Sequence, residues 1–264
     1  MLLIYFIYMS IVIDETAVKQ KRTKKPQQLL ERFYNNENTY EIAIDEVGRG
    51  CLFGRVYIAC VILPKDPELF CGKDIKDSKK FSSKKKLFDV AEYIKSHAYA
   101  WHVTWVDEKT IDEINILQST MRGMHECIRE IMAKTKQINI NTKNTDFMAV
   151  IDGNYFNPYR FFDEETQSIY ELPFITVEQG DAKYMSIAAA SILAKTARDE
   201  YIYQLCSQYP ILNERYSLES NVGYGTKAHL DGIAEFGITQ WHRRTFGNAC
   251  KNAVLNKIDE ISTV

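Results

Sequence analysis

Residues 41–63, EIAIDEVGRGCLFGRVYIACVIL, contain two apolar runs separated by a glycine-rich connection. The first run, Glu41 to Asp45, ends in an acid, and the second, Arg55 to Leu63, is rich in β-branched and aromatic residues and stops before Pro64. Runs of this length and composition are typical of strands. With the Gly-Arg-Gly connection at 48–50, the stretch predicts a hairpin-like pair of antiparallel strands.

The chain downstream alternates between strand patterns and helix patterns. We expect strands at Tyr99 to Val106, at Phe147 to Ile151, which is apolar enough to be a buried parallel strand, and at Phe174 to Val177. Apolar residues recur every three or four positions from Ile111 to about Ala133 and predict a long helix, and the alanine-rich stretch Ala182 to Leu205 predicts another. This order of elements indicates a mixed α/β layer fold.

One globular domain with extensions is the simplest organisation for 264 residues, of which 45% are hydrophobic. Residues 1–38 have the character of an N-terminal extension, and we expect the folded domain to begin near Tyr40 and to occupy residues 39–250, with a tail at 251–264. Beyond Tyr209 the chain is loop-rich, with a short helix near Lys227 to Phe236.

The net charge excludes a globally positive surface, because 33 basic residues stand against 35 acidic ones. Any nucleic-acid site must therefore be local. Basic residues cluster at 19–25, 76–86 and 242–244, and these clusters could together line one groove. A solvated helix face is the simpler explanation of each cluster taken alone.

The cysteines and the N-terminus indicate an intracellular, cytoplasmic protein that is not secreted. None of the six cysteines forms a C-x-x-C pair, which argues against a zinc ribbon or a disulfide framework. The first thirteen residues are nearly all apolar, but they lack a basic leader and are shorter than the roughly 20 residues that cross a bilayer. A short strand, an unstructured leader or a start of translation at Met9 are the alternatives.

Acidic residues stand where the expected strands and helices begin or end. Asp45 and Glu46 follow the first strand, Asp152 follows the fourth, and Asp181 precedes the alanine-rich helix. Open α/β sheets usually bind ligands at such ends. Carboxylates gathered without histidine or thiolate partners are stable mainly beside a hard divalent cation, and oxygen ligands favour magnesium or manganese. Turn and helix capping explain each acid individually, so spacing alone leaves both interpretations open.

A resemblance to a known family distinguishes between them. AIDEVGRGCLFGRV (43–56) resembles the opening motif of type 2 ribonucleases H, and the likeness covers Tyr40 to about Phe246, nearest to the bacterial form. The other matching blocks follow in the family's order: DSKKFSSKKK (77–86), INILQSTM (114–121), VIDGN (150–154), QGDAKYMSIAAASILAKTARD (179–199), GYGTKAH (223–229) and WHRRTF (241–246).

The resemblance implies a ribonuclease H-like α/β fold, with a mixed five-stranded sheet flanked by helices and a C-terminal helical and loop segment. It implies an endoribonuclease that hydrolyses the RNA strand of RNA/DNA hybrids and cuts DNA 5′ of embedded ribonucleotides, using two Mg²⁺ or Mn²⁺ ions. The expected products carry 3′-hydroxyl and 5′-phosphate ends. Ribonucleotide removal and RNA primer processing would be its role, and we expect a monomer.

The same resemblance implies roles for individual residues. It makes Asp45, Glu46, Asp152 and Asp181 the metal-binding, catalytic carboxylates. It makes Gly48, Arg49 and Gly50 the loop that recognises the ribonucleotide, with Arg49 on a phosphate. Glycine lets the backbone approach a sugar closely, and the 2′-hydroxyl is what distinguishes RNA from DNA.

Further substrate contacts follow from the later blocks. Tyr224 matches the family's junction-sensing tyrosine, whose hydroxyl bonds the 2′-oxygen while its ring packs on the next sugar, where deoxyribose fits best. An ordinary surface aromatic in a glycine turn is the alternative. Lys79, Lys80, Arg243 and Arg244 are expected to contact backbone phosphates, which gives affinity without reading base sequence.

The sequence departs from the family at several positions. Cys51, Phe53 and Arg55 stand where proline, alanine and proline are usual, so we expect the loop beyond Gly50 to be looser and more basic. Gln179 replaces a lysine that commonly precedes Gly-Asp. The segment Phe156 to Tyr170 is longer than in the bacterial form.

A short motif lies in the N-terminal extension. Gln27, Leu30, Phe33 and Tyr34 fit the pattern of a sliding-clamp-binding peptide, and basic residues lie just upstream at 21–25. The alternative is an amphipathic turn that packs on the domain. The basic run is also compatible with a nuclear address or an arm on nucleic acid.

Two other functions remain open from sequence. One is a non-catalytic protein that binds hybrids, which the presence of all the carboxylates disfavours. The other is a different nuclease or nucleotidyl transferase of the same fold, which would leave the Gly-Arg-Gly loop and Tyr224 without a purpose.

Overall fold

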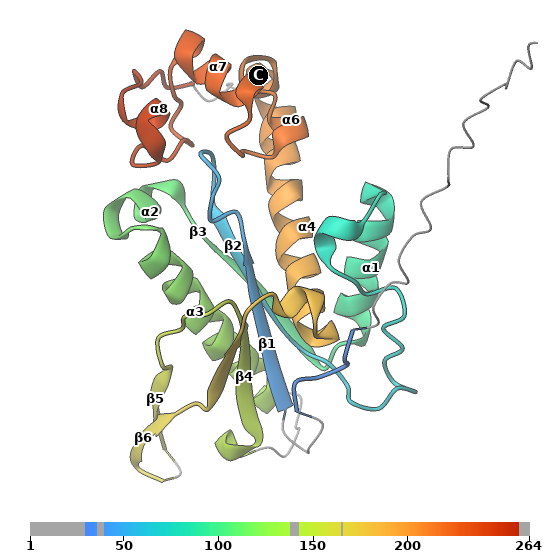
Figure 1. Ribbon diagram of the computed structural model, residues 1–264. Coiled ribbons are helices and arrows are strands. Elements are labelled where there is room, and N and C mark those ends of the chain that lie inside the picture. The colour runs from blue at the N-terminus through green and yellow to red at the C-terminus, as the bar shows by residue number, and fades with distance from the viewer. Residues whose placement is uncertain (1–29, 36–39, 138–142, 165, 259–264) are drawn as a thin grey trace, which may run out of the picture.

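A mixed five-stranded sheet with the order β3-β2-β1-β4-β7 forms the centre of the protein (Figure 1). The computed structural model describes residues 30–35, 40–137, 143–164 and 166–258. Antiparallel pairs join β1 (Tyr40–Val47) to β2 (Val56–Ile62) and β2 to β3 (Ala100–Val106). Parallel pairs join β1 to β4 (Phe147–Asp152) and β4 to β7 (Phe174–Val177). The predicted mixed five-stranded sheet is confirmed, as are the antiparallel pair at its start and the parallel strand at Phe147.

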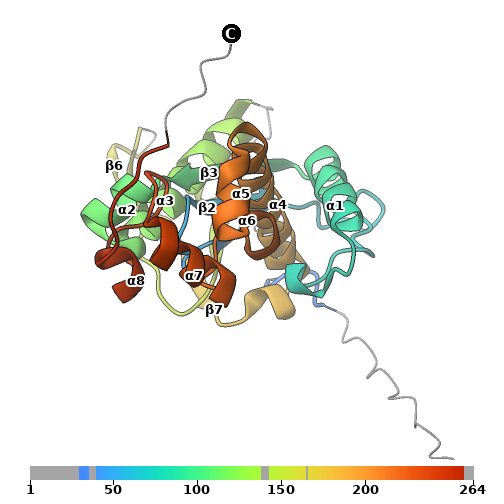
Figure 2. The same ribbon diagram turned by 90° about the horizontal axis from the view of Figure 1, so that it is seen from above.

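Helices cover both faces of this sheet. One face packs against α4 (Met185–Gln208) and α1 (Lys84–His97), and the other packs against α3 (Ile116–Gln137) (Figures 1 and 2). Successive side chains of a strand point to opposite faces, so Ala43 lies in the α4 core and Ile44 lies in the α3 core. Asp45 has the same parity as Ala43 and therefore faces α4.

The predicted long helix over 111–133 is wrong in one respect, because it is broken into α2 (Glu108–Ile114) and α3. Asn115 stands between them with a φ of +67° and a ψ of 165°, a backbone conformation that interrupts the helix and that residues other than glycine rarely adopt. Its side-chain oxygen accepts a hydrogen bond of 3.1 Å from Gln118 N and so caps α3. The alanine-rich helix begins at Met185, not Ala182, because a 3-10 turn, Gly180–Ala182, precedes it.

The C-terminal segment is more helical than the sequence indicated. Besides the predicted α7 (Lys227–Phe236), it contains α5 (Pro210–Tyr216), α6 (Leu218–Asn221) and α8 (Gly247–Lys251), and these helices enclose a separate apolar core. Leu255 and Ile258, from the predicted tail, pack against this core. Seen from above, these helices lie over one end of the sheet (Figure 2).

Two other segments differ from expectation. Ordered structure starts before Tyr40, because the backbone of Glu31 bonds to Lys183 O and Met185 N at 2.9 and 2.7 Å. The long segment 156–170 contains a hairpin of β5 (Arg160–Asp163) and β6 (Ser168–Glu171). Among the described residues, no helix is both long and apolar enough to cross a membrane.

Candidate active site

The sheet brings the acidic residues of three separate motifs to one place. Parallel pairing sets Ile44 beside Ile151, so the next residues, Asp45 and Asp152, leave neighbouring strands at the same edge. The Asp152 carboxylate accepts a hydrogen bond of 2.6 Å from Gly180 N, which holds the turn containing Asp181 against it. These acids therefore lie near one another at this edge of the sheet, and their role as metal ligands stays a prediction.

Burial and mutual repulsion disfavour the charged forms of these acids. Asp45 is only 4% exposed, and burial raises its pKa well above the usual value, with further increases from the charges of Glu46, Asp152 and Asp181. Burial also raises the pKa of Glu46 and that of Asp152. Arg49 partly offsets this increase for Glu46, because its positively charged Nη1 lies 3.2 Å from Glu46 Oε1.

The donor set fits a hard divalent cation. Glu46 Oε2 is buried and has no hydrogen-bond partner among the described residues, as expected of an oxygen reserved for a ligand. Within the part of the chain that the structure describes, no three acidic, histidine or cysteine side chains converge closely enough to enclose an ion. Magnesium usually takes one or two carboxylates and completes its shell with water and substrate phosphates, which is compatible with this arrangement.

The Gly48–Gly50 loop leaves β1 beside these acids. Gly48 has a φ of +92°, and a Cβ atom there would lie 2.3 Å from Arg198 Nε. The buried guanidinium group of Arg243 stabilises this loop, because it donates hydrogen bonds to Arg49 O and Gly54 O at 2.9 and 2.8 Å. The prediction that Arg243 contacts phosphate is therefore wrong: its side chain is fully buried and binds backbone carbonyls instead.

Arg198 is a functional candidate that the sequence reasoning missed. It is 1% exposed and donates to Val222 O, Phe53 O and Arg55 O at 2.7, 3.2 and 3.3 Å. A signal was present, because Arg198 shares helical spacing with Ala194 and Ile202 on the buried face of α4.

The loop beyond Gly50 is held firmly, so the expectation of a looser loop is wrong. Cys51 and Phe53 are fully buried. Backbone hydrogen bonds join Leu52 N to Gly223 O at 2.9 Å and Gly54 N to Trp241 O at 2.7 Å. Arg55 lies over the rings of Trp105 and Tyr201, with its Cζ 3.6 and 4.6 Å from their centroids. Its positive charge is therefore engaged in cation–π contacts within the protein.

The turn that carries Tyr224 lies directly beside this loop. Its ring is 44% exposed, between Gly223 and Gly225, and its centroid lies 5.9 Å from Arg198 Cζ. Burial raises the pKa of Tyr224, so its hydroxyl keeps its proton at neutral pH and can donate to an oxygen. The fold thus brings together two blocks about 170 positions apart in the sequence.

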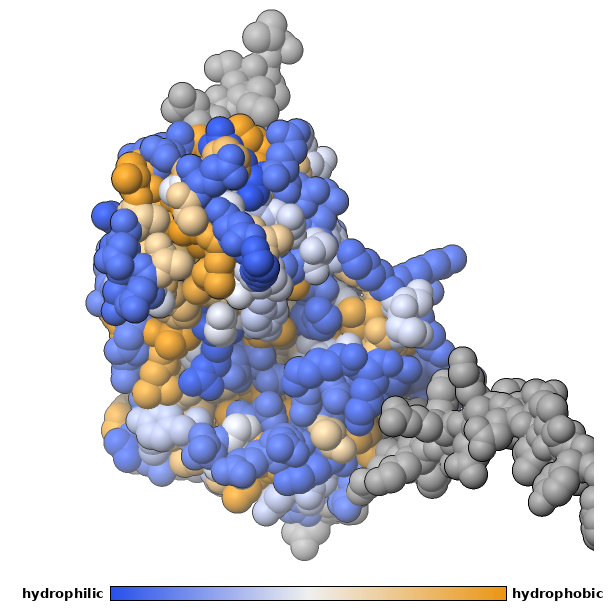
Figure 3. All heavy atoms as spheres, turned by 45° about the horizontal axis from the view of Figure 1, so that its top comes forward, coloured by the Kyte–Doolittle hydropathy of each residue, from blue (hydrophilic) through white to orange (hydrophobic). Residues whose placement is uncertain are grey.

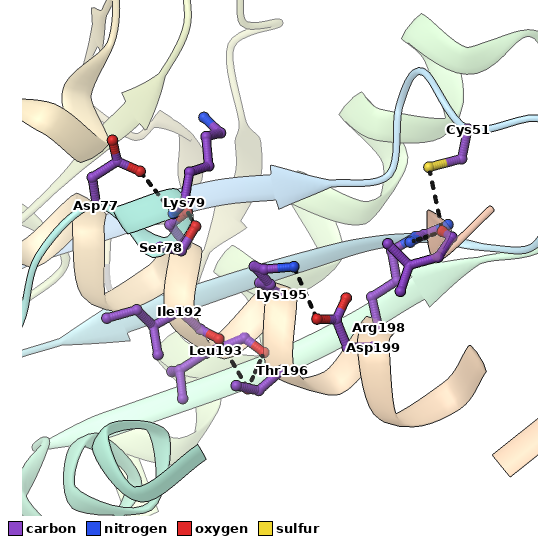
Figure 4. A network of polar contacts seen from close by, with 12 residues as sticks. Cys51, Asp77, Ser78, Lys79, Ile192, Leu193, Lys195, Thr196, Arg198 and Asp199 are labelled. Carbon is purple, nitrogen blue, oxygen red and sulfur yellow. Dashed lines mark hydrogen bonds and ion pairs between the residues drawn. The ribbon is translucent and has the colours of Figure 1, made fainter. Parts of the chain in front are cut away.

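Exposed lysines lie at the rim of the acidic cluster. The turn Ser78–Lys80 is held against α4 by a 3.1 Å contact between the hydroxyls of Ser78 and Ser191. Lys79 and Lys80 are exposed there, and Figure 4 shows this turn beside the part of α4 where Lys195 and Asp199 form an ion pair of 2.9 Å.

Arg244, unlike Arg243, is exposed, while its backbone N–H bonds to Asp112 at 2.8 Å. Hydrophilic residues cover most of the face seen when the C-terminal helices are turned forward (Figure 3). Of the four basic residues predicted to contact backbone phosphates, Lys79, Lys80 and Arg244 are exposed and Arg243 is buried.

The candidate clamp-binding motif is divided by the structure. Gln27 lies outside the described residues, whereas Phe33 is 3% exposed and packs in the α4 core with Leu30. Tyr34 is 43% exposed and meets Tyr184 edge-on with a centroid separation of 5.7 Å. The alternative interpretation, a segment packed on the domain, is confirmed for Leu30 to Tyr34.

Comparisons with known proteins identify relatives of this chain. The family model described as Ribonuclease HII matches residues 42–249. Ribonuclease HII of Bacteroides thetaiotaomicron is 41% identical over 81% of this chain and 92% of its own length. Ribonuclease HII of Oceanobacillus iheyensis is 38% identical over 84% of this chain and 75% of its own.

Solved structures show the same fold at lower identity. An Archaeoglobus fulgidus chain from a structure described as a PCNA:RNase HII complex has a TM-score of 0.55 at 24% identity, covering 79% of this chain and 95% of its own. Ribonuclease H2 from Pyrococcus horikoshii has a TM-score of 0.54 at 22% identity, covering 81% of this chain and 96% of its own.

Proposed function

The chain belongs to the ribonuclease HII family, and from this premise we propose that it cuts duplexes on the 5′ side of ribonucleotides, both in RNA/DNA hybrids and at ribonucleotides embedded in DNA. As a type 2 ribonuclease H it is a divalent-metal-dependent hydrolase that acts on RNA paired with DNA. The proposed products carry 3′-hydroxyl and 5′-phosphate ends. Its proposed roles are ribonucleotide removal and RNA primer processing inside the cell.

One observation carries this proposal: the buried acids lie beside a glycine loop and an exposed tyrosine that come from distant parts of the chain. Asp45, Glu46, Asp152 and Asp181 would hold two Mg²⁺ or Mn²⁺ ions. Such a pair, when bound, activates water and stabilises the leaving oxygen of an in-line displacement. The donor chemistry supports this assignment, because all the ligands are oxygens and Glu46 Oε2 is unsatisfied.

The chain's own residues would orient the substrate. Backbone groups of Gly48 and Gly50 can approach a ribose closely because no side chain intervenes. The protonated hydroxyl of Tyr224 can donate to the 2′-oxygen, and Lys79 can neutralise a phosphate at the rim. In this assignment the sugar is read by the loop and the tyrosine, while the lysine contributes affinity without base preference.

Substitution of Asp45 by asparagine tests the proposal. Asp45→Asn should abolish cleavage of a duplex with a single ribonucleotide, while circular dichroism and thermal unfolding show a folded protein. Asp89→Asn, at an exposed position of α1, is the matched control and should retain the wild-type rate. Near-normal rates for Asp45→Asn, or equal cleavage of all-DNA duplexes, would contradict the mechanism.

The same assay separates the alternatives. A hybrid-binding protein without activity would bind the duplex but release no product in either magnesium or manganese. Comparing one embedded ribonucleotide with a fully hybrid duplex, in each metal in turn, identifies the preferred substrate and ion.

Clamp binding through residues 27–34 is a second proposal, supported by the motif and by the fold shared with a chain from a structure described as a PCNA:RNase HII complex. Because Phe33 is buried, the motif would have to leave its place in the core before it could enter a clamp groove. Phe33→Ala should cost about 3 kcal/mol or more of stability if the side chain only packs. Direct measurement of clamp affinity for the wild type and for Gln27→Ala, which leaves the packed residues intact, tests binding separately. Sedimentation would test the expectation of a monomer.

A further inference from the structure

Two histidines from the C-terminal segment meet inside the protein, away from the acidic cluster. His229 in α7 is fully buried, and His242 is 1% exposed. Their Nε2 atoms lie 3.1 Å apart. The ring of Tyr216 lies edge-on to both, with centroids 5.9 Å from His229 and 4.8 Å from His242.

The partners at the two ends of the pair determine where the protons are. Tyr224 O, which can only accept, lies 3.0 Å from His229 Nδ1, so that nitrogen must carry a proton. Thr239 N, which can only donate, lies 3.0 Å from His242 Nδ1, so that nitrogen must be bare. His242 Nε2 then donates a hydrogen bond to His229 Nε2. The contact with Tyr224 O and the contact with Thr239 N each require this same arrangement of protons.

Neutral rings are a condition of this chain of hydrogen bonds, because a proton added to either ring would place two N–H groups face to face. Burial lowers the pKa of His229 and, together with the charge of His229, lowers that of His242 to about 3. Both rings are therefore neutral at physiological pH, as the hydrogen bonds require.

The hydrogen bonds lead to the candidate substrate site. Tyr224 lies between Gly223, whose φ is +86°, and Gly225, and glycines leave a turn with much conformational freedom. The His229 contact is one of two hydrogen bonds that hold the Tyr224 carbonyl; the other comes from Thr226 N at 2.8 Å. Arg243 directly follows His242 in the sequence, and its Nη1 donates a hydrogen bond of 2.9 Å to the carbonyl of Arg49.

We propose that His229 and His242 are positioning residues of the ribonucleotide pocket, which hold the Tyr224 turn in register with the Gly48–Gly50 loop. His242 and Arg243 are consecutive in the sequence. The His242 side chain contacts His229, which holds the Tyr224 turn, and the Arg243 side chain bonds to Arg49 in the Gly48–Gly50 loop. The backbone of this dipeptide therefore couples the tyrosine to the loop. The inference rests on the proposed function of Tyr224.

Nitrogen-15 NMR of the full-length wild-type protein tests the hydrogen-bond chain without any substitution. His229 should be protonated at Nδ1 and His242 at Nε2. Because burial lowers the pKa of His242 to about 3, its ring should not titrate between pH 5 and 8. The reverse tautomers, or titration of His242 in that range, would overturn the arrangement.

A double-mutant cycle tests positioning. His229→Phe should lower kcat/KM at a single embedded ribonucleotide by about tenfold relative to a full hybrid, the loss expected for one buried hydrogen bond. In the Tyr224→Ala background the same substitution should cost nothing more, because the residue that it positions is gone. Equal losses in both backgrounds would mean that His229 is only structural and would overturn the inference.

Two further variants keep the test decisive. His229→Asn places an amide donor near the position of Nδ1 and should recover part of the activity that His229→Phe loses. His97→Phe, at an exposed site of α1, is the control for the loss of an imidazole. If Tyr224→Ala leaves the preference between the two substrates unchanged, the proposed role of Tyr224 fails, an outcome distinct from additive losses in the cycle.

Discussion

Lys79 Nζ lies 3.2 Å from Asp181 Oδ2, although 102 positions separate the two residues in the sequence. The Lys79 side chain is 78% exposed, whereas that of Asp181 is 7% exposed. The ion pair therefore joins the exposed end of a lysine to a buried carboxylate of the candidate metal site. Its geometry places a cation at the entrance, where a substrate phosphate would arrive.

Replacing Lys79 by methionine should weaken binding to all duplexes by a similar factor, because the lysine contacts phosphate and not bases. The slope of log affinity against log salt should decrease in magnitude by about one for the lost contact. Filter binding or anisotropy over a salt series measures it. Lys95→Met, in the last turn of α1, is the control; an unchanged slope for Lys79→Met would show that Lys79 does not reach the backbone.

Glycine substitutions in the Gly-Arg-Gly loop should separate stability from recognition. Gly48→Ala should lower the unfolding free energy by about 1–3 kcal/mol, because its φ is +92° and its Cβ would collide with Arg198. Gly50→Ala should leave stability unchanged, since a Cβ there has nothing within 4 Å. Denaturant unfolding measures both. If Gly50→Ala nevertheless loses activity, close approach of the sugar is the reason; equal stability of the two variants would contradict this account.

Neighbouring arginines should behave differently. Arg243→Gln should cost about 2–3 kcal/mol of stability, because it leaves the carbonyls of Arg49 and Gly54 without buried donors. Arg244→Gln should leave the melting temperature unchanged and reduce only the salt dependence of binding. Thermal unfolding and binding titrations, made on both variants, check this. A stable Arg243→Gln protein with weaker phosphate binding would restore the role expected from sequence.

Acid should destabilise the protein partly through His242. Its pKa is lowered to about 3 in the folded state, whereas the unfolded chain retains a value near 6.5. Between these values the unfolded state binds a proton that the folded state does not, so the stability that this group contributes is complete above pH 6.5 and is lost as pH falls toward 3. The slope is at most about 1.4 kcal/mol per pH unit.

Urea unfolding at several pH values measures this slope. His242→Gln should show a weaker dependence on pH than the wild type over the range from 6 to 4, and His97→Gln, which removes an exposed imidazole, should follow the wild type. Identical slopes for His242→Gln and wild type would mean that folding does not lower the pKa of this ring.

Patterns that depend on neighbouring residues were readable from the sequence. The strand Phe174–Val177 and the helix Lys227–Phe236 coincide with the structure, because apolar runs and helical spacing reflect local burial. The short helices α5, α6 and α8 were not predicted, since four to seven residues carry too little periodicity. Helix α1 was obscured by its lysines, which line its first turn.

By itself, the sequence determined the α/β class and the order of the five sheet strands along the chain, because these follow from local pattern, and its long motif blocks singled out the acids on which the proposed function rests. Only the tertiary structure decided that Arg243 is buried while Arg244 is exposed, and that His229 meets His242. Arg243 and Arg244 are adjacent and identical in type, so the sequence cannot tell which of them is buried. Whether a side chain points inward depends on which distant segment packs against it. The burial of a charged side chain such as Arg243, and the hydrogen bond between His229 and His242, therefore depend on the complete tertiary fold.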